Sequence, residues 1–285
     1  MTIIPPPLPD IILEPIVRLA LSEDLGRAGD LTTDATIDPN RTLKADFRAR
    51  EAGIVAGLDA AKYALQLVDP STKLEIFHND GSEVAPGQTI ATLSGSARSI
   101  LIAERTMLNF LGRLSAIASL TKKFSAAVSH TSAKIVCTRK TTPGHRALEK
   151  RAVRCGGGTA HRYGLDDAIL IKDNHIAACG SISEALQRAH AYAGHLRMIE
   201  IEVDTLDQLR QALPHAPHVI LLDNMDPATL KTAVNIVDGQ CKTEASGGIT
   251  LQTVAKVAET GVDYISVGAL THSATNMDFG LDILT

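Results

Sequence analysis

The second half of the chain repeats one pattern, in which a short apolar, β-rich run alternates with a stretch of helical periodicity. The β-rich runs lie at residues 134–138, 168–172, 198–203, 219–223, 242–246 and 264–268. Helix-like stretches follow most of them, at residues 182–193, 206–213, 227–237 and 251–260. Such alternation predicts a parallel sheet. The apolar centres of the runs predict strands that are buried on both faces.

Polar residues gather at the carboxyl ends of these predicted strands. In a (β/α) barrel those ends converge on one mouth, where active sites lie. The residues are Thr138, Arg139, Lys140, Lys172, Asp173, Asn174, His175, Glu202, Asp204, Asp223, Asn224, Ser246, Gly247, Gly248, Gly268 and Ala269. An open doubly wound sheet would also bind ligands at strand ends. No Gly-x-Gly-x-x-Gly fingerprint follows the first strand, so we predict an α/β protein with a (β/α) barrel.

The first hundred residues read differently and predict a smaller α+β sandwich. A helical run at residues 12–21 precedes short β-like runs at 43–50, 54–57 and 74–78. Residues 81–93 superficially resemble the strands of a biotin- or lipoyl-carrying domain, but they present no lysine at a hairpin tip. A helix from 99 to about 128 is the natural connector. We predict an N-terminal domain at 1–115, with the connector helix, and a barrel domain at 116–285. Whether the extreme C-terminus packs back on the N-terminal domain is left open.

Composition excludes several classes of function. The 285-residue chain has a formal charge of −4, no Trp and 3% aromatic residues, so we expect no nucleic-acid partner. The N-terminus lacks a signal-peptide pattern and no apolar run is long enough for a membrane helix, so we expect a soluble, cytoplasmic protein with no membrane partner. The scattered cysteines predict neither a disulfide framework nor a zinc site. They are Cys137, Cys155, Cys179 and Cys241, and we expect Cys155 to be a structural thiol.

Basic residues are dense in one segment of the predicted barrel. Residues 139–172 hold eight Lys or Arg against three Asp or Glu. Four of these predict a solvated helix face: Arg146, Lys150, Arg151 and Arg154. Three others end apolar strands, namely Arg139, Lys140 and Lys172. Buried charges need partners, and guanidinium groups bind carboxylates in a bidentate manner, so an anionic ligand is expected.

Two further features of the predicted mouth suit a sugar phosphate and its metal. Ser246-Gly247-Gly248 and Gly268-Ala269 follow the last two strands, where barrels bind phosphate through backbone amides. Glu202 and Asp223 end successive strands, so they can hold Mg²⁺ beside a phosphate, or pair with Lys140 and Lys172 when the site is empty. A glycine-rich segment at 156–158 precedes His161 and Arg162, and we expect it to deliver them to the mouth.

Taken together, the motifs resemble those of the quinolinate phosphoribosyltransferase family over nearly the whole chain. The matching segments are Glu23-Asp-Leu-Gly26, Asp30-Leu-Thr-Thr33, Glu104-Arg-Thr-Met-Leu-Asn-Phe-Leu111, Thr138-Arg-Lys-Thr-Thr-Pro-Gly144, 148–158, His161-Arg-Tyr-Gly-Leu165, Ile171-Lys-Asp-Asn-His-Ile176, Leu221-Leu-Asp-Asn-Met225, Glu244-Ala-Ser-Gly-Gly-Ile249 and 263–272. The resemblance implies a transferase of NAD biosynthesis that converts quinolinate and phosphoribosyl pyrophosphate to nicotinate mononucleotide, pyrophosphate and CO₂, using Mg²⁺. It also implies an α/β fold whose C-terminal (β/α) barrel is open on one side, and a homodimer with shared sites; a higher oligomer is left open.

The resemblance also implies roles for individual residues. Quinolinate is bound by Arg139, His161 and Arg162, with Thr138 in the same motif and Arg105 reaching in from the partner subunit. Lys140 and Lys172 hold the pyrophosphate. Glu202 and Asp223 serve the ribose and the metal. The 5′-phosphate is received by Ser246, Gly247, Gly248, Gly268 and Ala269.

Two other functions remain open from the sequence. A paralogous phosphoribosyltransferase family, linked to molybdenum-transport operons, shares the run from Thr138 to Gly144, whereas the Lys172–His175 run favours the quinolinate enzyme. A barrel that binds sugar phosphates without catalysis is the second. The full set of strand-end Lys, Glu and Asp residues argues against it, because a sensor needs fewer charges.

Overall fold

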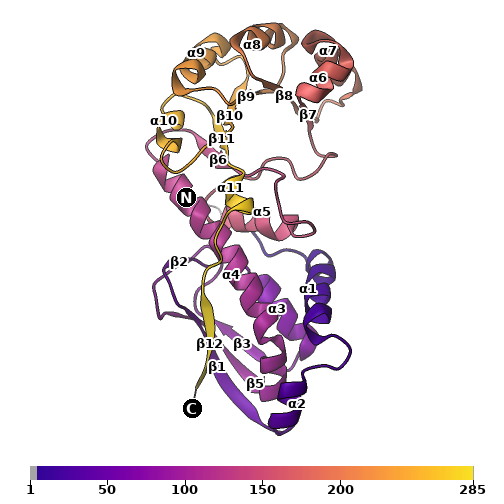
Figure 1. Ribbon diagram of the computed structural model, residues 1–285, viewed down its shortest axis with the longest axis vertical. Coiled ribbons are helices and arrows are strands. Elements are labelled where there is room, and N and C mark those ends of the chain that lie inside the picture. Colours follow the sequence, from indigo (N-terminus) through magenta and orange to yellow (C-terminus); the bar gives the residue numbers. More distant parts are fainter. Residues whose placement is uncertain (1–4, 285) are drawn as a thin grey trace. The chain divides into compact units, whose positions relative to one another are not determined.

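The computed structural model describes residues 5–284 and divides into two compact units (Figure 1). The first unit holds the chain up to Lys122, the segment Thr141–Gly157 and the C-terminal segment from Thr271. The second holds Lys123–Lys140 and Gly158–Leu270. The first contains an antiparallel sheet and the second a parallel one, which confirms the predicted α/β class with a separate N-terminal α+β part.

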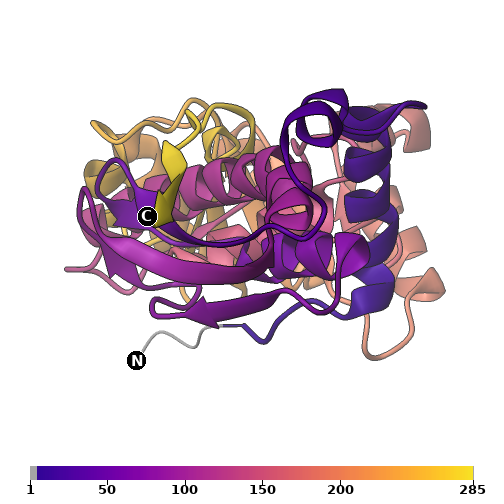
Figure 2. The same cartoon turned by 90° about the horizontal axis from the view of Figure 1, so that it is seen from below.

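The antiparallel sheet of the first unit has the strand order β12-β1-β5-β3. Its strands are β1 (Thr42–Ala49), β3 (Lys73–Ile76), β5 (Thr89–Ser96) and β12 (Phe279–Leu284). The C-terminal strand β12 runs antiparallel to β1, from Ala49↔Phe279 to Lys44↔Leu284 (Figure 2). A second, two-stranded sheet pairs β2 (Gly53–Ile54) with β4 (Glu83–Val84). The sheet of the first unit therefore includes the last strand of the chain.

Helices of the first unit bury apolar stripes. Their bounds are α1 (Asp10–Leu25), α2 (Leu31–Thr36), α3 (Leu58–Val68), α4 (Ala97–Ala127) and α5 (Arg146–Cys155). In α3, Leu58, Ala61 and Leu65 are buried at helical spacing. Helix α4 has 31 residues and contains the predicted connector. No helix within residues 5–284 combines the length and the hydropathy needed to span a membrane.

Helix α5 differs from its sequence-based description. Lys150 and Arg151 are buried, so the prediction of a solvated face is wrong for these two residues, although Arg154 is exposed. The guanidinium of Arg151 forms an ion pair with Asp80, and its Nε lies 3.4 Å from a carboxylate oxygen of Asp59. Both carboxylates are distant from Arg151 in sequence. Their negative charge offsets the cost of burying the guanidinium.

Six parallel strands form the sheet of the second unit, in the order β6-β11-β10-β9-β8-β7. They are β6 (Lys134–Val136), β7 (Ile169–Ile171), β8 (Ile199–Val203), β9 (Val219–Asp223), β10 (Lys242–Ser246) and β11 (Tyr264–Ser266). All lie within the predicted β-rich runs. Strands β6 and β7 are the two edges, so the barrel is open on one side, as predicted.

Helices cover the outer side of this curved sheet (Figure 1). They are α6 (Asp173–Cys179), α7 (Ile182–Tyr192), α8 (Leu206–Ala212), the 3₁₀ turn η1 (Leu213–His215), α9 (Pro227–Val237) and α10 (Val254–Ala258), and the short helix α11 (Ala269–His272) follows β11. Side chains fix where three of them begin, because Ser181, Thr205 and Asp226 each accept a hydrogen bond from a backbone N–H in the first turn. Thr205 and Asp226 come soon after the ends of β8 and β9, so short loops connect these strand ends to the helices that follow.

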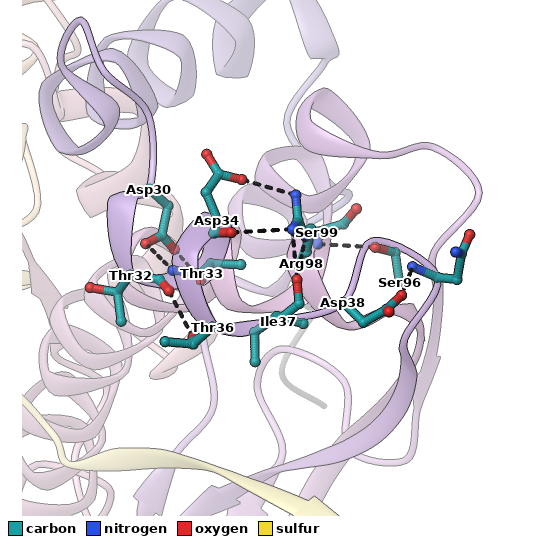
Figure 3. Close-up of polar contacts among 11 residues, drawn as sticks. Asp30, Thr32, Thr33, Asp34, Thr36, Ile37, Asp38, Ser96, Arg98 and Ser99 are labelled. Carbon is teal, nitrogen blue, oxygen red and sulfur yellow. Dashed lines mark hydrogen bonds and ion pairs between the residues drawn. The ribbon is translucent and has the colours of Figure 1, made fainter.

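In the first unit, Arg98 ties α4 to the segment after α2 (Figure 3). Its Nε and Nη2 both donate to the carbonyl oxygen of Ile37, at 2.9 and 2.6 Å. Its Nη1 donates to Asp34 at 3.1 Å. At the other end of α2, the carboxylate of Asp30 caps the helix by accepting from the backbone N–H of Thr33 at 3.0 Å. These contacts fix both ends of a helix that has only one and a half turns.

Replacing Arg98 by alanine should lower the free energy of unfolding by about 1–3 kcal/mol, because the charge-assisted hydrogen bonds to Ile37 and Asp34 are lost. Chemical denaturation followed by circular dichroism measures the change. Arg18→Ala is the matched control, since Arg18 forms only an exposed pair with Glu14 and should cost about 0–0.5 kcal/mol. Equal losses in the two variants would show that Arg98 adds no stability beyond an ordinary surface pair.

Candidate active site

A cavity of about 360 Å³ lies within the second unit, and polar side chains from the strand ends line much of it. Its lining residues are Thr138, Arg139, Lys140, His161, Arg162, Leu170, Lys172, Glu202, Leu221, Asp223, Glu244, Ser246 and Ser266. Nine of the fourteen site residues proposed from the sequence are in this list. Carboxyl ends of parallel strands meet at one edge, which explains how residues more than a hundred positions apart come together.

Two guanidinium groups, those of Arg139 and Arg162, line this cavity. Burial lowers the pKa of Arg162 from its ordinary value, and the positive charge of Arg139 lowers it further. Arg162 donates from Nη1 to the carbonyl oxygen of Ala168 at 3.3 Å. Its buried Nε has no hydrogen-bond partner among residues 5–284. The cavity wall thus presents concentrated positive charge and a spare donor, which suits a carboxylate ligand.

The rest of the lining includes lysine and carboxylate side chains. Lys172, at the end of β7, donates from Nζ to the carboxylate of Glu202 on β8. Asp223, at the end of the adjacent β9, accepts from the side-chain amide of Asn224 at 2.6 Å. The backbone N–H of Lys140 donates to the hydroxyl of Thr138 at 3.0 Å. Carboxylates on neighbouring strands fit the oxygen-ligand preference of Mg²⁺, and the Lys172–Glu202 ion pair is the one expected without metal.

Below these residues lies a second, buried polar layer. Glu200 and Glu244 stand two residues before Glu202 and Ser246 on their strands, and residues two apart share one face of a strand. Both side chains are buried. Nε2 of His161 lies 3.2 Å from Glu200 Oε2 and 3.5 Å from Glu244 Oε1. One imidazole therefore sits against two carboxyl groups.

The hydrogen bonds of His161 define its tautomer. The backbone N–H of Arg162 donates to Nδ1 of His161 at 2.8 Å. Nδ1 then carries no proton, so the proton of the neutral ring is on Nε2 and points to the glutamates. The Nε2, Glu200 and Glu244 atoms lie within 4.8 Å of one another, close enough to surround a cation. A protonated Nε2 offers no lone pair, however, so the geometry favours hydrogen bonding over metal coordination.

Burial and the negative charge of Glu200 raise the pKa of Glu244 to about 7, against the opposite effects of His161 and Ser266. Glu244 therefore keeps a proton up to a higher pH than an ordinary carboxyl group does.

The glycine segments after β10 and β11 hold the remaining predicted phosphate ligands. Gly247 has φ of +94°, and a Cβ atom there would lie 2.0 Å from Oδ1 of Asn224 and 2.8 Å from its backbone nitrogen. Only glycine fits this close approach between the ends of β9 and β10. Ser246 lines the cavity. Gly248, Gly268 and Ala269 follow the same strand ends but are not among the lining residues.

Other residues singled out from the sequence lie elsewhere. Arg105 is exposed on α4 in the first unit. Cys155 is buried, and burial with the nearby charge of Asp80 raises the pKa of its thiol to about 12. A thiol with that pKa is a poor nucleophile, in agreement with the predicted structural role.

Sequence reasoning missed Glu200, Glu244 and Ser266. Their signal was present, because each precedes a strand-end residue by two positions and so shares its face. Charged residues inside an apolar strand are rare unless paired or functional, so the two glutamates within β8 and β10 could have been noticed.

The fold and cavity define an open α/β-barrel protein with a site for an anionic ligand. The C-terminal domain model of quinolinate phosphoribosyl transferase matches residues 117–282, and its N-terminal domain model matches residues 30–115. The chain therefore belongs to the quinolinate phosphoribosyltransferase family.

Individual relatives match this chain over most of their lengths. The mitochondrial quinolinate phosphoribosyltransferase [decarboxylating] 2b of Nicotiana tabacum is 43% identical, over 99% of this chain and 85% of the relative. The probable nicotinate-nucleotide pyrophosphorylase [carboxylating] of Bacillus subtilis is 44% identical, over 92% and 90%. The solved nicotinate-nucleotide pyrophosphorylase of Francisella tularensis is 38% identical with a TM-score of 0.93, over 97% and 98%.

The raised pKa of Glu244 predicts a pH-dependent stability. Because the folded state binds this proton more tightly than the unfolded state, wild type should lose stability as pH rises from about 4.5 to about 7. In the Glu244→Gln variant, the glutamine side chain cannot ionise. The free energy of unfolding of this variant relative to wild type should therefore increase by about 1–3 kcal/mol between pH 5 and pH 8. Denaturant titrations at several pH values measure this; a difference that does not change with pH would contradict the assigned proton.

Proposed function

We propose that this protein transfers the phosphoribosyl group of phosphoribosyl pyrophosphate to quinolinate with decarboxylation, yielding nicotinate mononucleotide, pyrophosphate and CO₂ for NAD biosynthesis. One observation carries the proposal: a single cavity is lined by two arginines together with two lysines and two strand-end carboxylates, Glu202 and Asp223. A dicarboxylate ring and an activated sugar diphosphate need these two kinds of surface side by side. The relatives' names support the same activity.

Arg139 and Arg162 bind the carboxylates of quinolinate, with Thr138 and His161 beside them in the wall. A bidentate guanidinium contact fixes the plane of the ring as well as its charge. Arg162 is held by its bond to Ala168 and keeps Nε available. Holding the ring nitrogen in line with the ribose is an orientation task that can supply much of the rate. Both nitrogens of His161 face protein groups, so its contribution is to position the wall.

Lys140 and Lys172 stabilise the departing pyrophosphate. Glu202 and Asp223 face the ribose, where their negative charge favours the positive charge that develops at the anomeric carbon. The same carboxylates would hold Mg²⁺, which neutralises charge on the diphosphate when it is bound. Substrate binding then replaces the Lys172–Glu202 ion pair by contacts of each residue with the diphosphate and its metal. Ser246, Gly247, Gly248, Gly268 and Ala269 receive the 5′-phosphate.

We also propose a homodimer in which Arg105 of each chain completes the quinolinate site of its partner. Arg105 is an exposed cation on α4 of the first unit, a position suited to contact with another chain. We expect a cytoplasmic location, although plant relatives carry the words mitochondrial or chloroplastic in their names.

Purified protein with both substrates and Mg²⁺ should release CO₂ and pyrophosphate in equal amounts. Lys172→Ala should lower kcat by about 10²–10³-fold, because a charge opposite the leaving group is lost. The matched control is Lys242→Ala. It removes an exposed lysine at the amino end of β10, whose Nζ lies 2.7 Å from a carboxylate oxygen of Asp263. Folded wild-type protein that releases neither product would exclude the activity. Equal kinetics for the two variants would exclude the role of Lys172.

Subunit sharing predicts complementation between inactive variants. In a mixture of Arg105→Ala and Arg139→Ala chains, each mixed dimer would contain one site with both arginines intact. Equal mixing with subunit exchange should restore about a quarter of wild-type activity. If Arg105 acts within its own chain, every site lacks one arginine and the mixture stays inactive. Separate variants measured at the same total concentration are the control.

A further inference from the structure

The proposed reaction requires a proton at a defined atom. When CO₂ leaves the quinolinate mononucleotide, the electron pair of the broken bond remains on ring carbon C2. The quaternised ring nitrogen stabilises this pair, but the product has a hydrogen at C2, so an acid must act there. The inference below rests on the proposed function in this respect.

We propose that Glu244 is the general acid that protonates C2 after decarboxylation. Its side chain lines the cavity and is nevertheless buried, with 4% of its surface exposed. It stands one strand repeat below Ser246, on the same face of β10. It also lies 3.5 Å from the ring of His161, whose neighbour Arg162 binds the quinolinate carboxylates in the proposed function. A carboxyl group in this position contacts the cavity but is itself largely shielded from bulk water.

The surroundings of Glu244 favour a proton on its carboxyl group. Nε2 of His161 faces both Glu200 and Glu244. Oε1 of each glutamate is buried without a hydrogen bond within the described part of the chain. Burial disfavours the ionised form of a carboxyl group, and so does a second carboxylate close by. Burial and the charge of Glu200 therefore raise the pKa of Glu244, although His161 and Ser266 act in the opposite direction.

Glu244 is also the chemically suitable donor among the lining residues. Arginine does not lose its proton in proteins. Lysine is a weaker acid by several pKa units, and the proposed function needs the charge of Lys140 and Lys172 on the diphosphate. A neutral carboxylic acid with a pKa near 7 is matched to a donor that works at neutral pH.

The step balances as follows. The bond between C2 and its carboxylate breaks, CO₂ departs, and both bonding electrons stay on C2. That pair takes the proton of the Glu244 carboxyl group, which forms the new C–H bond and leaves Glu244 as a carboxylate. After product release, Glu244 regains one proton from solvent through the opened cavity. One proton is consumed for each CO₂ formed, and no oxidant or reductant is needed.

The test measures pyrophosphate and CO₂ separately in single turnovers of Glu244→Gln. Cleavage of the C2–carboxylate bond is reversible until C2 is protonated, so loss of the acid should slow CO₂ release. We expect pyrophosphate release within about twofold of wild type, CO₂ release slower by about 10²-fold, and accumulation of quinolinate mononucleotide. Equal slowing of both products would overturn the proposal and make Glu244 a residue that positions substrate. Unchanged release of both would overturn it in favour of protonation by water.

Glu200→Gln is the matched control, since it makes the same change in the same buried cluster and leaves the Glu244 acid. Pyrophosphate and CO₂ should appear together in this variant, and a CO₂ lag equal to that of Glu244→Gln would overturn the assignment to Glu244. Glu244→Asp retains the acid and should release CO₂ faster than Glu244→Gln; equal lags would count against the proposal. Should Glu244→Gln fail to fold, the comparison of Glu244→Asp with wild type decides. If wild type releases neither product, the proposed function itself has failed, which is a distinct result.

Discussion

The site depends on the positive charge that Arg139 and Arg162 bring to one cavity. Burial lowers the pKa of Arg162, and the charge of Arg139 lowers it further, yet the guanidinium stays charged because arginine does not lose its proton in proteins. The carbonyl oxygen of Ala168 accepts one hydrogen bond from Arg162, and the charges of Glu200 and Asp167 act against the lowering of its pKa. A ligand with two carboxylates offsets this positive charge and satisfies the spare donor of Arg162 at the same time. Binding and specificity therefore come from one electrostatic imbalance that the fold maintains.

Opposite charges are arranged in two layers along the strands of the second unit. The upper layer, with Lys172, Glu202 and Asp223, is partly exposed and can exchange an ion pair for contacts with a charged substrate. The lower layer, with Glu200 and Glu244, is buried, and its negative charge is limited by the raised pKa of Glu244. Exposed charges are suited to binding anions and metal, whereas a buried carboxyl group is suited to proton transfer because its pKa is shifted.

Much of the second unit could be predicted from the sequence because its signals are local. Apolar runs fix the strands, capping residues such as Ser181 and Asp226 fix the helices that follow, and strand ends then share one edge. Lys172, Glu202 and Asp223 were predicted at the cavity for this reason. Burial of Arg151 could not be read in this way, since it depends on Asp59 and Asp80 from other parts of the chain. Likewise, nothing in the sequence of β12 identifies β1 as the strand with which it pairs, because the paired residues lie at least 230 positions apart in the chain.

The two missed glutamates show what a search for strand-end residues overlooks. That search treats the interior of a buried strand as packing, so Glu244 reads as part of β10 rather than as part of the site. A barrel places alternate residues of every strand toward its interior, and the position two residues below the mouth is therefore also a site position. There the same carboxyl group meets a drier environment and a like charge instead of a lysine. Because residues two apart on a strand share one face, glutamate can have two chemical roles in the proposed site. At the mouth it is a charged ligand, and two residues below the mouth it is a protonated acid.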